Sequence, residues 1–241
     1  MSNLSQDIIS NSGIKIFQDK ELYSFNLDTI LLYNFAKTVK KGKIVDLCAG
    51  NGAIGLSLAS KTKAQIYLVE LQEQLSRLAE KSVSENGLEN QVEVINTDIK
   101  NIQDHIMHDS IDMLVCNPPY FTSKQTTLIK DNQVLAIARH ELKTNINEVL
   151  YTIKVLLKEN AHAYIVYRPD RLSDLFAGMS QNLLQAKRIR FVRSHANDDA
   201  NLVLVDVIKT VKSASLRVEP DLIMYDGDNL STEGKRIIDG E

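Results

Sequence analysis

Apolar runs typical of inner strands alternate with helical patterns along most of this chain. The helical patterns cover residues 53–61, 72–87, 146–160 and 171–185. Strands that alternate with helices form βαβ units with right-handed crossovers, and these build a parallel sheet. The sequence therefore predicts an α/β fold with a doubly wound, mostly parallel, seven-stranded sheet. Its strands are expected within residues 43–50, 65–70, 91–98, 111–116, 161–169, 187–194 and 201–211.

The two ends of the chain differ from this alternating middle part. Only the polar loop "HANDDA" separates the last two strand patterns, so the last strand should pair antiparallel with its neighbour. Before the first strand, residues 25–42 read as a helix with Asn26 or Asp28 as its N-cap and Gly42 as its stop. We expect an N-terminal cap over 1–42, the α/β domain over 43–212 and an acidic C-terminal extension over 213–241.

Composition excludes several classes of protein. The chain has 241 residues, 44% of them hydrophobic, which is enough for a sizeable core. Its two cysteines, Cys48 and Cys116, each end an apolar run and are expected as reduced, non-catalytic thiols. No histidines or cysteines have metal-ligand spacing, no signal peptide is recognisable, and no apolar run approaches the ~20 residues that span a bilayer. We expect a cytoplasmic, monomeric protein without a metal or a membrane contact.

Charge is distributed unevenly along the chain. The net charge is −3, but residues 218–241 hold seven acidic and only two basic side chains. The run "AKRIRFVR" over 186–193 holds four basic side chains. This run fits a strand with one solvated face, and it also fits phosphate contacts through Lys187, Arg188, Arg190 and Arg193.

A glycine-rich turn follows the first strand of the sheet. In "DLCAGNGAIG", the residues Gly50, Gly52 and Gly55 spell GxGxxG. Open parallel sheets bind ligands outside the carboxyl ends of their strands, and glycines let a backbone turn tightly there. Alone, this motif fits a dinucleotide-binding loop equally well.

Acidic residues at three successive strand ends indicate which class of ligand the turn binds. Asp46 lies just before the turn, where it would repel a pyrophosphate and suit a cationic ligand. Glu70 ends the second strand and can accept from the two hydroxyls of a ribose. Asp98 ends the third strand and can reach an adenine amine, although a helix N-cap is the simpler interpretation for it alone. Together the three acids fit S-adenosylmethionine, an adenosine with a positive charge and no phosphate.

The stretch "DMLVCNPPYFTSK" over 112–124 ends a buried strand with groups that suit a planar nitrogen. Asn117 offers a side-chain oxygen, and Pro118 offers a backbone carbonyl that the ring of Pro119 holds in place. These acceptors can bind both N–H groups of an exocyclic amine and favour the pyramidal form that attacks a methyl donor. Tyr120 offers a face on which a base can stack.

In their order and spacing, "VDLCAGNGAIG", "VELQ", "NTDI" and "NPPY" resemble the class I S-adenosylmethionine-dependent methyltransferases that modify amino groups. "FNLDTILL" and "IARHE" look like one subgroup, the bacterial tRNA(Val) adenine-N6 methyltransferases. The resemblance implies a Rossmann-like fold, tRNA as the partner, and methylation of an adenine N6 amine next to the anticodon of a valine tRNA. The cofactor-binding candidates are Asp46, Gly50, Gly52, Glu70, Asp98 and Asn117, and the catalytic candidates are Asn117, Pro118 and Tyr120.

Two further candidates lie in "IARHE", after NPPY. Arg139 and His140 either contact the extruded nucleotide or anchor the helix that follows. With Pro119, Tyr120, Lys187 and Arg190, they make up the set of expected substrate contacts.

Four other functions stay open. NPPY would also serve the carboxamide of a protein glutamine or the N2 amine of a guanine in rRNA. Only about 40 residues precede the first strand, fewer than expected for a domain that binds a release factor. An NAD-binding oxidoreductase is disfavoured by Asp46, and a non-catalytic RNA-binding module has no use for Asn117 together with Glu70.

Overall fold

The computed structural model describes residues 4–9, 12–19, 26–118 and 146–239. Its centre is a twisted nine-stranded sheet with the order β10-β8-β9-β7-β6-β3-β4-β5, and β11 also pairs with β8. Seven of these strands are the predicted ones. They are β3 (Lys43–Leu47), β4 (Gln65–Glu70), β5 (Val92–Asn96), β6 (Ile111–Cys116), β7 (Leu157–Tyr167), β8 (Leu184–Arg193) and β9 (Leu202–Lys209).

The directions of the strands confirm the predicted topology. β3, β4, β5, β6 and β7 pair in parallel, whereas β9 pairs antiparallel with both β7 and β8. Two short strands from the acidic C-terminal segment, β10 (Arg217–Val218) and β11 (Leu222–Ile223), extend the sheet beyond the predicted seven by pairing with β8. The fold is therefore the doubly wound α/β sheet, widened at one edge.

Alternate side chains of the inner strands point to two separate cores. Ile44 and Leu68 lie in one buried cluster, and Val45 and Leu47 lie in the other. The first cluster includes residues of α1 (Leu27–Phe35), α2 (Ala53–Ala59) and α3 (Glu73–Glu85), and the second includes residues of α5 (Ile146–Leu156) and α6 (Leu172–Gln181). Because helices cover both faces, the inner strands are apolar on both sides, which is why they read as continuous apolar runs.

Gly87 ends α3 as the sequence predicts. It has a φ of +64°, its amide donates to the Ser84 carbonyl, and the amide of Leu88 donates to the Val83 carbonyl. These two bonds form the Schellman arrangement, in which a left-handed glycine satisfies the last helical carbonyls.

The expected role of Gly42 as a helix stop is wrong. α1 ends at Phe35, and Ala36 is already extended. Gly42 has a φ of +107° and turns the chain into β3, where its carbonyl accepts from the amide of Gln65 at 2.9 Å. Asn26 occupies the N-cap position of α1, but its side chain caps no backbone amide of the helix.

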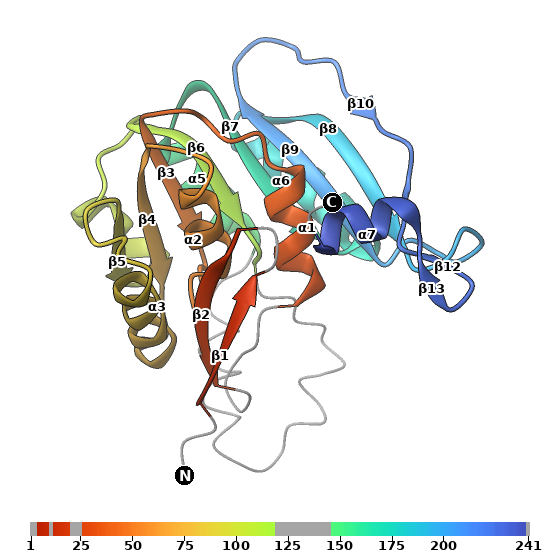
Figure 1. The fold of residues 1–241 in the computed structure, drawn as a ribbon. Coiled ribbons are helices and arrows are strands. Elements are labelled where there is room, and N and C mark those ends of the chain that lie inside the picture. Colours follow the sequence, from red (N-terminus) through yellow and green to blue (C-terminus); the bar gives the residue numbers. More distant parts are fainter. Residues whose placement is uncertain (1–3, 10–11, 20–25, 119–145, 240–241) are drawn as a thin grey trace, which may run out of the picture.

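An N-terminal hairpin, which the sequence patterns did not indicate, packs on α3. β1 (Leu4–Ile9) and β2 (Ile14–Asp19) pair antiparallel, and Figure 1 shows them beside the central sheet. The amide of Phe17 donates to Ser82 Oγ at 2.9 Å, and the side chain of Asn86 bonds both backbone groups of Lys15. Polar groups on α3 thus hold the hairpin.

The C-terminal segment continues from β11 to a helix that packs on α1. It forms the small hairpin β12 (Tyr225–Asp226) and β13 (Asn229–Leu230), followed by α7 (Thr232–Asp239). α7 lies beside α1 (Figure 1), where Asn34 Nδ2 donates to the carbonyl of Ile237 at 3.3 Å. Two short 3-10 helices, η1 (Ile99–Asp104) and η2 (Pro169–Arg171), follow β5 and β7. Within the described residues, no helix is long and apolar enough to cross a membrane.

Candidate active site

The carboxyl ends of β3, β4, β5 and β6 meet along one edge of the sheet. Leu47 is the register partner of both Val69 and Cys116, and Glu70 is the partner of Asn96. The glycine turn after β3, the acid that ends β4 and the asparagine after β6 are therefore neighbours. This is the edge at which parallel sheets bind ligands.

The glycine turn takes a shape that depends on its glycines. Gly50 and Gly52 have φ values of +58° and +82°, a region that favours glycine. A Cβ on Gly52 would lie 2.8 Å from Cδ1 of Leu68, and a Cβ on Gly55 would lie 3.1 Å from Cβ of Asp46. The missing side chains let α2 begin directly against β3 and β4.

Asp46 is a completely buried acid beneath this turn. Its Oδ2 accepts from the amide of Gly55 at 2.7 Å, while its Oδ1 is buried without a hydrogen-bond partner among the described residues. Burial raises the pKa of Asp46 to about 7; the Gly55 hydrogen bond opposes this shift, and the charge of Glu70 adds to it. A buried acceptor with a spare oxygen is suited to a ligand that carries positive charge.

Glu70 ties the ends of β3 and β4 together. Its Oε2 accepts from the amide of Gly50 at 2.8 Å, and its Oε1 accepts from the amide of Gln72 at 2.9 Å. Glu70 is only 7% exposed. Each carboxylate oxygen can accept a second hydrogen bond, so the predicted contact with ribose hydroxyls fits this geometry and stays a prediction.

Asp98 caps the short helix η1. Its Oδ1 accepts from the amide of Lys100 at 3.0 Å, and its side chain is half-buried. The capping interpretation, which the sequence favoured for this residue alone, is thus confirmed. A contact between Asp98 and an adenine amine stays a prediction.

Asn117 and Pro118 follow β6 directly. Asn117 is half-buried and Pro118 is buried, at the end of a strand whose last residue, Cys116, is the register partner of Ile165 on β7. The two residues therefore lie at the same edge as Asp46 and Glu70. The other expected contacts of this region, Pro119, Tyr120, Arg139 and His140, lie outside the described residues.

Asn51 is a buried polar residue of the turn that the sequence patterns did not single out. It is fully buried, its Nδ2 donates to the carbonyl of Phe17 at 3.3 Å, and its Oδ1 has no partner among the described residues. The sequence signal that could have identified Asn51 is its position between Gly50 and Gly52 in the GxGxxG motif. Asn51 also connects the turn to the N-terminal hairpin, so that hairpin is part of the site's support.

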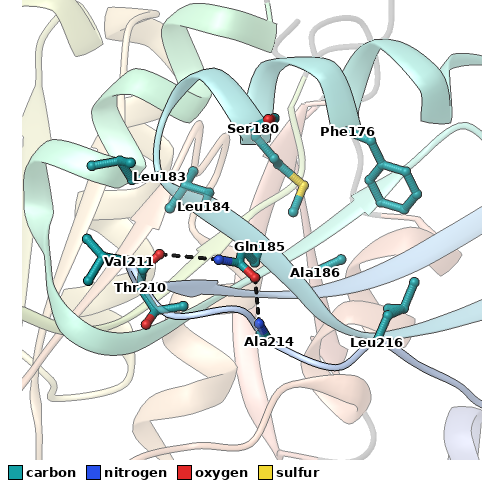
Figure 2. Close-up of a pocket in the computed structure, with 11 residues that line it drawn as sticks. Phe176, Ser180, Leu183, Leu184, Gln185, Ala186, Thr210, Val211, Ala214 and Leu216 are labelled. Carbon is teal, nitrogen blue, oxygen red and sulfur yellow. Dashed lines mark hydrogen bonds between the residues drawn. The ribbon is translucent and has the colours of Figure 1, made fainter.

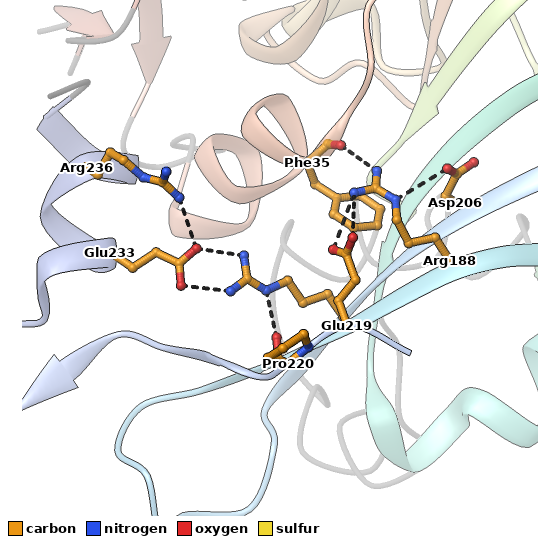
Figure 3. Close-up of polar contacts among 8 residues, drawn as sticks. Phe35, Arg188, Asp206, Glu219, Pro220, Glu233 and Arg236 are labelled. Atoms are coloured by element: carbon orange, nitrogen blue, oxygen red, sulfur yellow. Dashed lines mark hydrogen bonds and ion pairs between the residues drawn. The ribbon is translucent and has the colours of Figure 1, made fainter. Parts of the chain in front are cut away.

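The basic strand β8 faces the acidic C-terminal segment. Arg190 holds both carboxylate oxygens of Glu233, at 2.9 and 2.8 Å, within the network shown in Figure 3. The Arg190 hydrogen bond is the main reason why the pKa of Glu233 is lowered. Further ion pairs join Arg188 to Glu219 and Arg193 to Asp221.

These ion pairs explain why basic and acidic residues are concentrated in different parts of the sequence. The acids of the C-terminal segment neutralise the arginines of β8, while Lys187 is half-buried on the same strand. The phosphate contact expected at Lys187 stays a prediction. Those expected at Arg188, Arg190 and Arg193 are untested, and each would require a phosphate to displace a paired carboxylate.

A separate pocket of about 450 Å³ lies at the opposite edge of the sheet. It is lined by residues at the start of β8 and just after β9, including Leu184 and Val211. Figure 2 shows Gln185 in this pocket, where its side chain accepts from the amide of Ala214 at 2.7 Å. The pocket is remote from the glycine turn and holds none of the expected site residues.

Among the residues that the structure describes, no three His, Cys, Asp or Glu side chains are grouped to hold a metal ion. The polar side chains at the carboxyl edge include the buried Asp46, Glu70 and Asn51 and the half-buried Asn117, all of which can accept hydrogen bonds.

Comparison with known proteins gives a consistent result. The family model described as "Methyltransferase small domain" matches residues 17–155. The tRNA1(Val) (adenine(37)-N6)-methyltransferase of Photobacterium profundum is 27% identical over 191 residues, which cover 78% of this chain and 78% of that protein.

Solved structures agree on the fold. A crystal structure of a predicted O-methyltransferase from Agrobacterium tumefaciens superposes with a TM-score of 0.71 at 19% identity, covering 89% of this chain and 96% of that one. M. jannaschii TYW2, solved in complex with AdoMet, has a TM-score of 0.57 at 14% identity and covers 87% of this chain and 88% of its own.

Proposed function

Because the chain belongs to the methyltransferase small domain family, we propose that it methylates the N6 amine of an adenine in tRNA, with S-adenosylmethionine as the methyl donor. The observation that carries the proposal is the meeting of Asp46, Glu70 and Asn117 at one sheet edge around the glycine turn. We place the enzyme in the cytoplasm as a monomer, with the domain over 43–212 framed by the segments 1–42 and 213–241.

The residues at the turn fit S-adenosylmethionine. Oδ1 of Asp46 and Oδ1 of Asn51 are both buried acceptors without a partner among the described residues, and leaving such groups unpaired is costly. A ligand with N–H donors and positive charge would satisfy both. We assign the ribose hydroxyls to Glu70 and the adenine amine to Asp98, whose carboxylates also accept from the amides of Gly50 and Lys100. When bound, S-adenosylmethionine supplies an electrophilic methyl group on a positively charged sulfur.

Asn117 and Pro118 would act on the methyl acceptor. The nitrogen of an exocyclic amine is a weak nucleophile because its lone pair is delocalised into the ring. Hydrogen bonds from its two N–H groups to the Asn117 side-chain oxygen and the Pro118 carbonyl would hold the lone pair toward the donor. Such fixed acceptors do not reorganise during the reaction, so they favour the transition state over the ground state. The proton leaves the nitrogen after the methyl group has been transferred.

The choice of tRNA as substrate rests on the relatives. The Photobacterium profundum protein is named for adenine 37 of a valine tRNA, and it matches 78% of this chain. An adenine within a stacked loop must be extruded before its amine reaches a buried site, at a cost of roughly a few kcal/mol. We assign the stacking of the extruded base to Tyr120, and contacts with its neighbours to Pro119, Arg139 and His140.

A methyl-transfer assay with several acceptors tests the proposal. The purified chain is incubated with methyl-labelled S-adenosylmethionine and, separately, with unmodified valine tRNA, the same tRNA with guanine in place of the adenine, ribosomal RNA or a glutamine-containing release factor. We expect label only in the first reaction. Label in ribosomal RNA or protein would replace the proposed substrate, and label in none of the four would contradict the proposed activity.

A further inference from the structure

Two thiols meet where the glycine turn leaves β3. Leu47 and Cys116 are register partners on β3 and β6, so Cys48 follows β3 directly beside the end of β6. Both cysteines are free, and their thiols are hydrogen-bonded to each other. The pair joins the first residue after β3 to the last residue before Asn117.

The backbone of Cys48 brings its thiol to this position. In a regular strand, successive side chains point to opposite faces. Cys48 instead has a φ of +60°, a left-handed conformation that is uncommon for a residue other than glycine, and it packs against the same core cluster as Leu47. Strained conformations of this kind gather at functional sites.

The two thiols differ in access. Cys48 is half-buried, whereas Cys116 has no exposed surface. Burial, followed by the hydrogen bond and charge of Cys48 and the charge of Asp46, raises the pKa of Cys116 well above its usual range. Because only Cys48 reaches the surface, an oxidant would react first at Cys48.

We propose that Cys48 and Cys116 are a modification site, a dithiol that peroxide converts into a disulfide and that thereby closes the methyl-transfer site reversibly. In the first step, the Cys48 thiol gives up its proton, its sulfur attacks hydrogen peroxide and the O–O bond breaks. Cys48 sulfenic acid forms, and the released hydroxide takes up the proton and leaves as water. In the second step, the Cys116 sulfur displaces the sulfenic oxygen, which leaves as water. Two thiols lose two electrons and two protons, and one peroxide becomes two waters. A small dithiol or thioredoxin-type reductant reverses the change.

The disulfide would disturb the site because of where its ends lie. A disulfide needs a sulfur–sulfur distance of about 2.0 Å, much shorter than a hydrogen bond between thiols. Closing it would draw together Cys48, two residues before Gly50, and Cys116, one residue before Asn117. A displacement of about 1 Å in a preorganised site can lower a rate by about 10²-fold. This effect on activity rests on the proposed function, whereas formation of the disulfide does not.

The test begins with the disulfide itself. The full-length protein is treated with hydrogen peroxide, unreacted thiols are blocked with an alkylating reagent, and the digested peptides are mapped by mass spectrometry. We expect one crosslinked peptide pair that contains Cys48 and Cys116 and disappears after dithiothreitol. Stable sulfinic or sulfonic acid at Cys48 without the crosslink would overturn the proposal, and so would two thiols that remain alkylatable.

Two single variants provide matched controls. Cys48→Gly removes one thiol and suits the positive φ, while Cys116→Ala removes the other with little loss of volume. We expect peroxide to lower S-adenosylmethionine binding at least about tenfold in the wild-type protein, with recovery after dithiothreitol, and to leave both variants unchanged. Equal loss in wild type and variants would refute control by this pair.

The peptide map and the S-adenosylmethionine binding measurement separate this inference from the proposed function. If the reduced protein fails to bind S-adenosylmethionine, the proposed function fails, and the peptide map alone decides whether the dithiol is a modification site. If the reduced protein binds and methylates but no crosslink forms, only the dithiol proposal fails.

Discussion

The carboxylate of Asp46 accepts a hydrogen bond from the amide of Gly55 at 2.7 Å, although Asp46 has no exposed surface. One oxygen therefore caps the beginning of α2, and the other is buried without a partner among the described residues. The acid stabilises the glycine turn locally, but burying its charge is costly. Protonation of the Asp46 carboxyl group should therefore affect both the stability of the fold and the binding of a ligand.

The raised pKa of Asp46 predicts that the free energy of unfolding depends on pH. Its pKa is about 7 in the folded protein, above the ordinary value of 3.8 that the unfolded chain keeps, so the folded protein holds a proton that the unfolded chain releases. The contribution of Asp46 to stability is fully present below about pH 4 and is lost as the pH rises through 7. Asp46→Asn cannot titrate, so between pH 4 and 8 the wild-type protein should lose up to about 4 kcal/mol relative to the variant. Urea unfolding of both proteins at several pH values measures this difference, and parallel curves would contradict it.

Glu70 should contribute to the affinity for S-adenosylmethionine. Glu70→Ala removes the acceptor for Gly50 and for the expected ribose hydroxyls, and S-adenosylmethionine binding should weaken by about 1.5–3 kcal/mol, the range for hydrogen bonds to a charged group. Glu70→Gln keeps one acceptor oxygen and should lose less. Calorimetric titration of the three proteins tests the order, and wild-type affinity in Glu70→Ala would remove this residue from the site.

Alanine variants at Gly52 and Gly87 distinguish the cost of a positive φ from the cost of a steric contact. Both have positive φ, but a Cβ on Gly52 meets Leu68 whereas a Cβ on Gly87 meets nothing within 4 Å. Gly87→Ala should therefore cost only the left-handed conformation, roughly 1–2 kcal/mol. Gly52→Ala should cost more and should also weaken cofactor binding. Denaturant unfolding compares the two variants, and an equal loss would mean that the contact with Leu68 relaxes freely.

Arg190 should contribute to stability more than to RNA binding. Its guanidinium is held by Glu233, so Arg190→Ala should lower the free energy of unfolding by about 1.5–3 kcal/mol. Because Glu233 already holds this guanidinium, Arg190→Ala should leave the slope of log tRNA affinity against log salt concentration nearly unchanged. Lys187→Ala should reduce that slope by about 0.7–0.9, the range for one lost phosphate contact. A reduced slope for Arg190→Ala would show that phosphate displaces Glu233.

The inner strands, their directions and the end of α3 were predictable from sequence because they depend on local patterns. The apolar runs indicated the strands, and Gly87 ended α3. The ends of the parallel strands bring Asp46, Glu70 and Asn117 to one edge, whose role in ligand binding stays a prediction. The N-terminal hairpin was missed because its anchors lie about 70 residues away, Ser82 on α3 and Asn86 at its C-cap. The same holds for the C-terminal strands, which form only because β8 offers an unpaired edge.

Within the site, residue types were predictable but their partners were not. Nothing in the sequence indicates that the carboxylate of Glu70 already accepts from Gly50 and Gln72, or that Asn51 leaves an oxygen unpartnered among the described residues. Such pairings depend on how two loops meet in space.

Asn117 carries the central chemical claim. Its side-chain oxygen should matter mainly in the transition state, where the adenine nitrogen becomes pyramidal and its hydrogens acidic. Asn117→Ala should lower the rate of methyl transfer by about 10²–10³-fold, as expected for loss of one preorganised hydrogen bond, and should leave cofactor and tRNA affinity nearly intact. A variant with both cysteines changed to alanine is the control and should keep its rate within a few-fold.

Nucleoside mass analysis under single-turnover conditions tests this claim most directly. Unmodified valine tRNA is incubated with S-adenosylmethionine and an excess of either the wild-type protein or Asn117→Ala, and the digested nucleosides are followed over time. The account predicts rapid appearance of N6-methyladenosine with the wild-type protein and its near absence with the variant. N6-methyladenosine formed by Asn117→Ala at the wild-type rate, or a different methylated nucleoside formed by the wild-type protein, would contradict it.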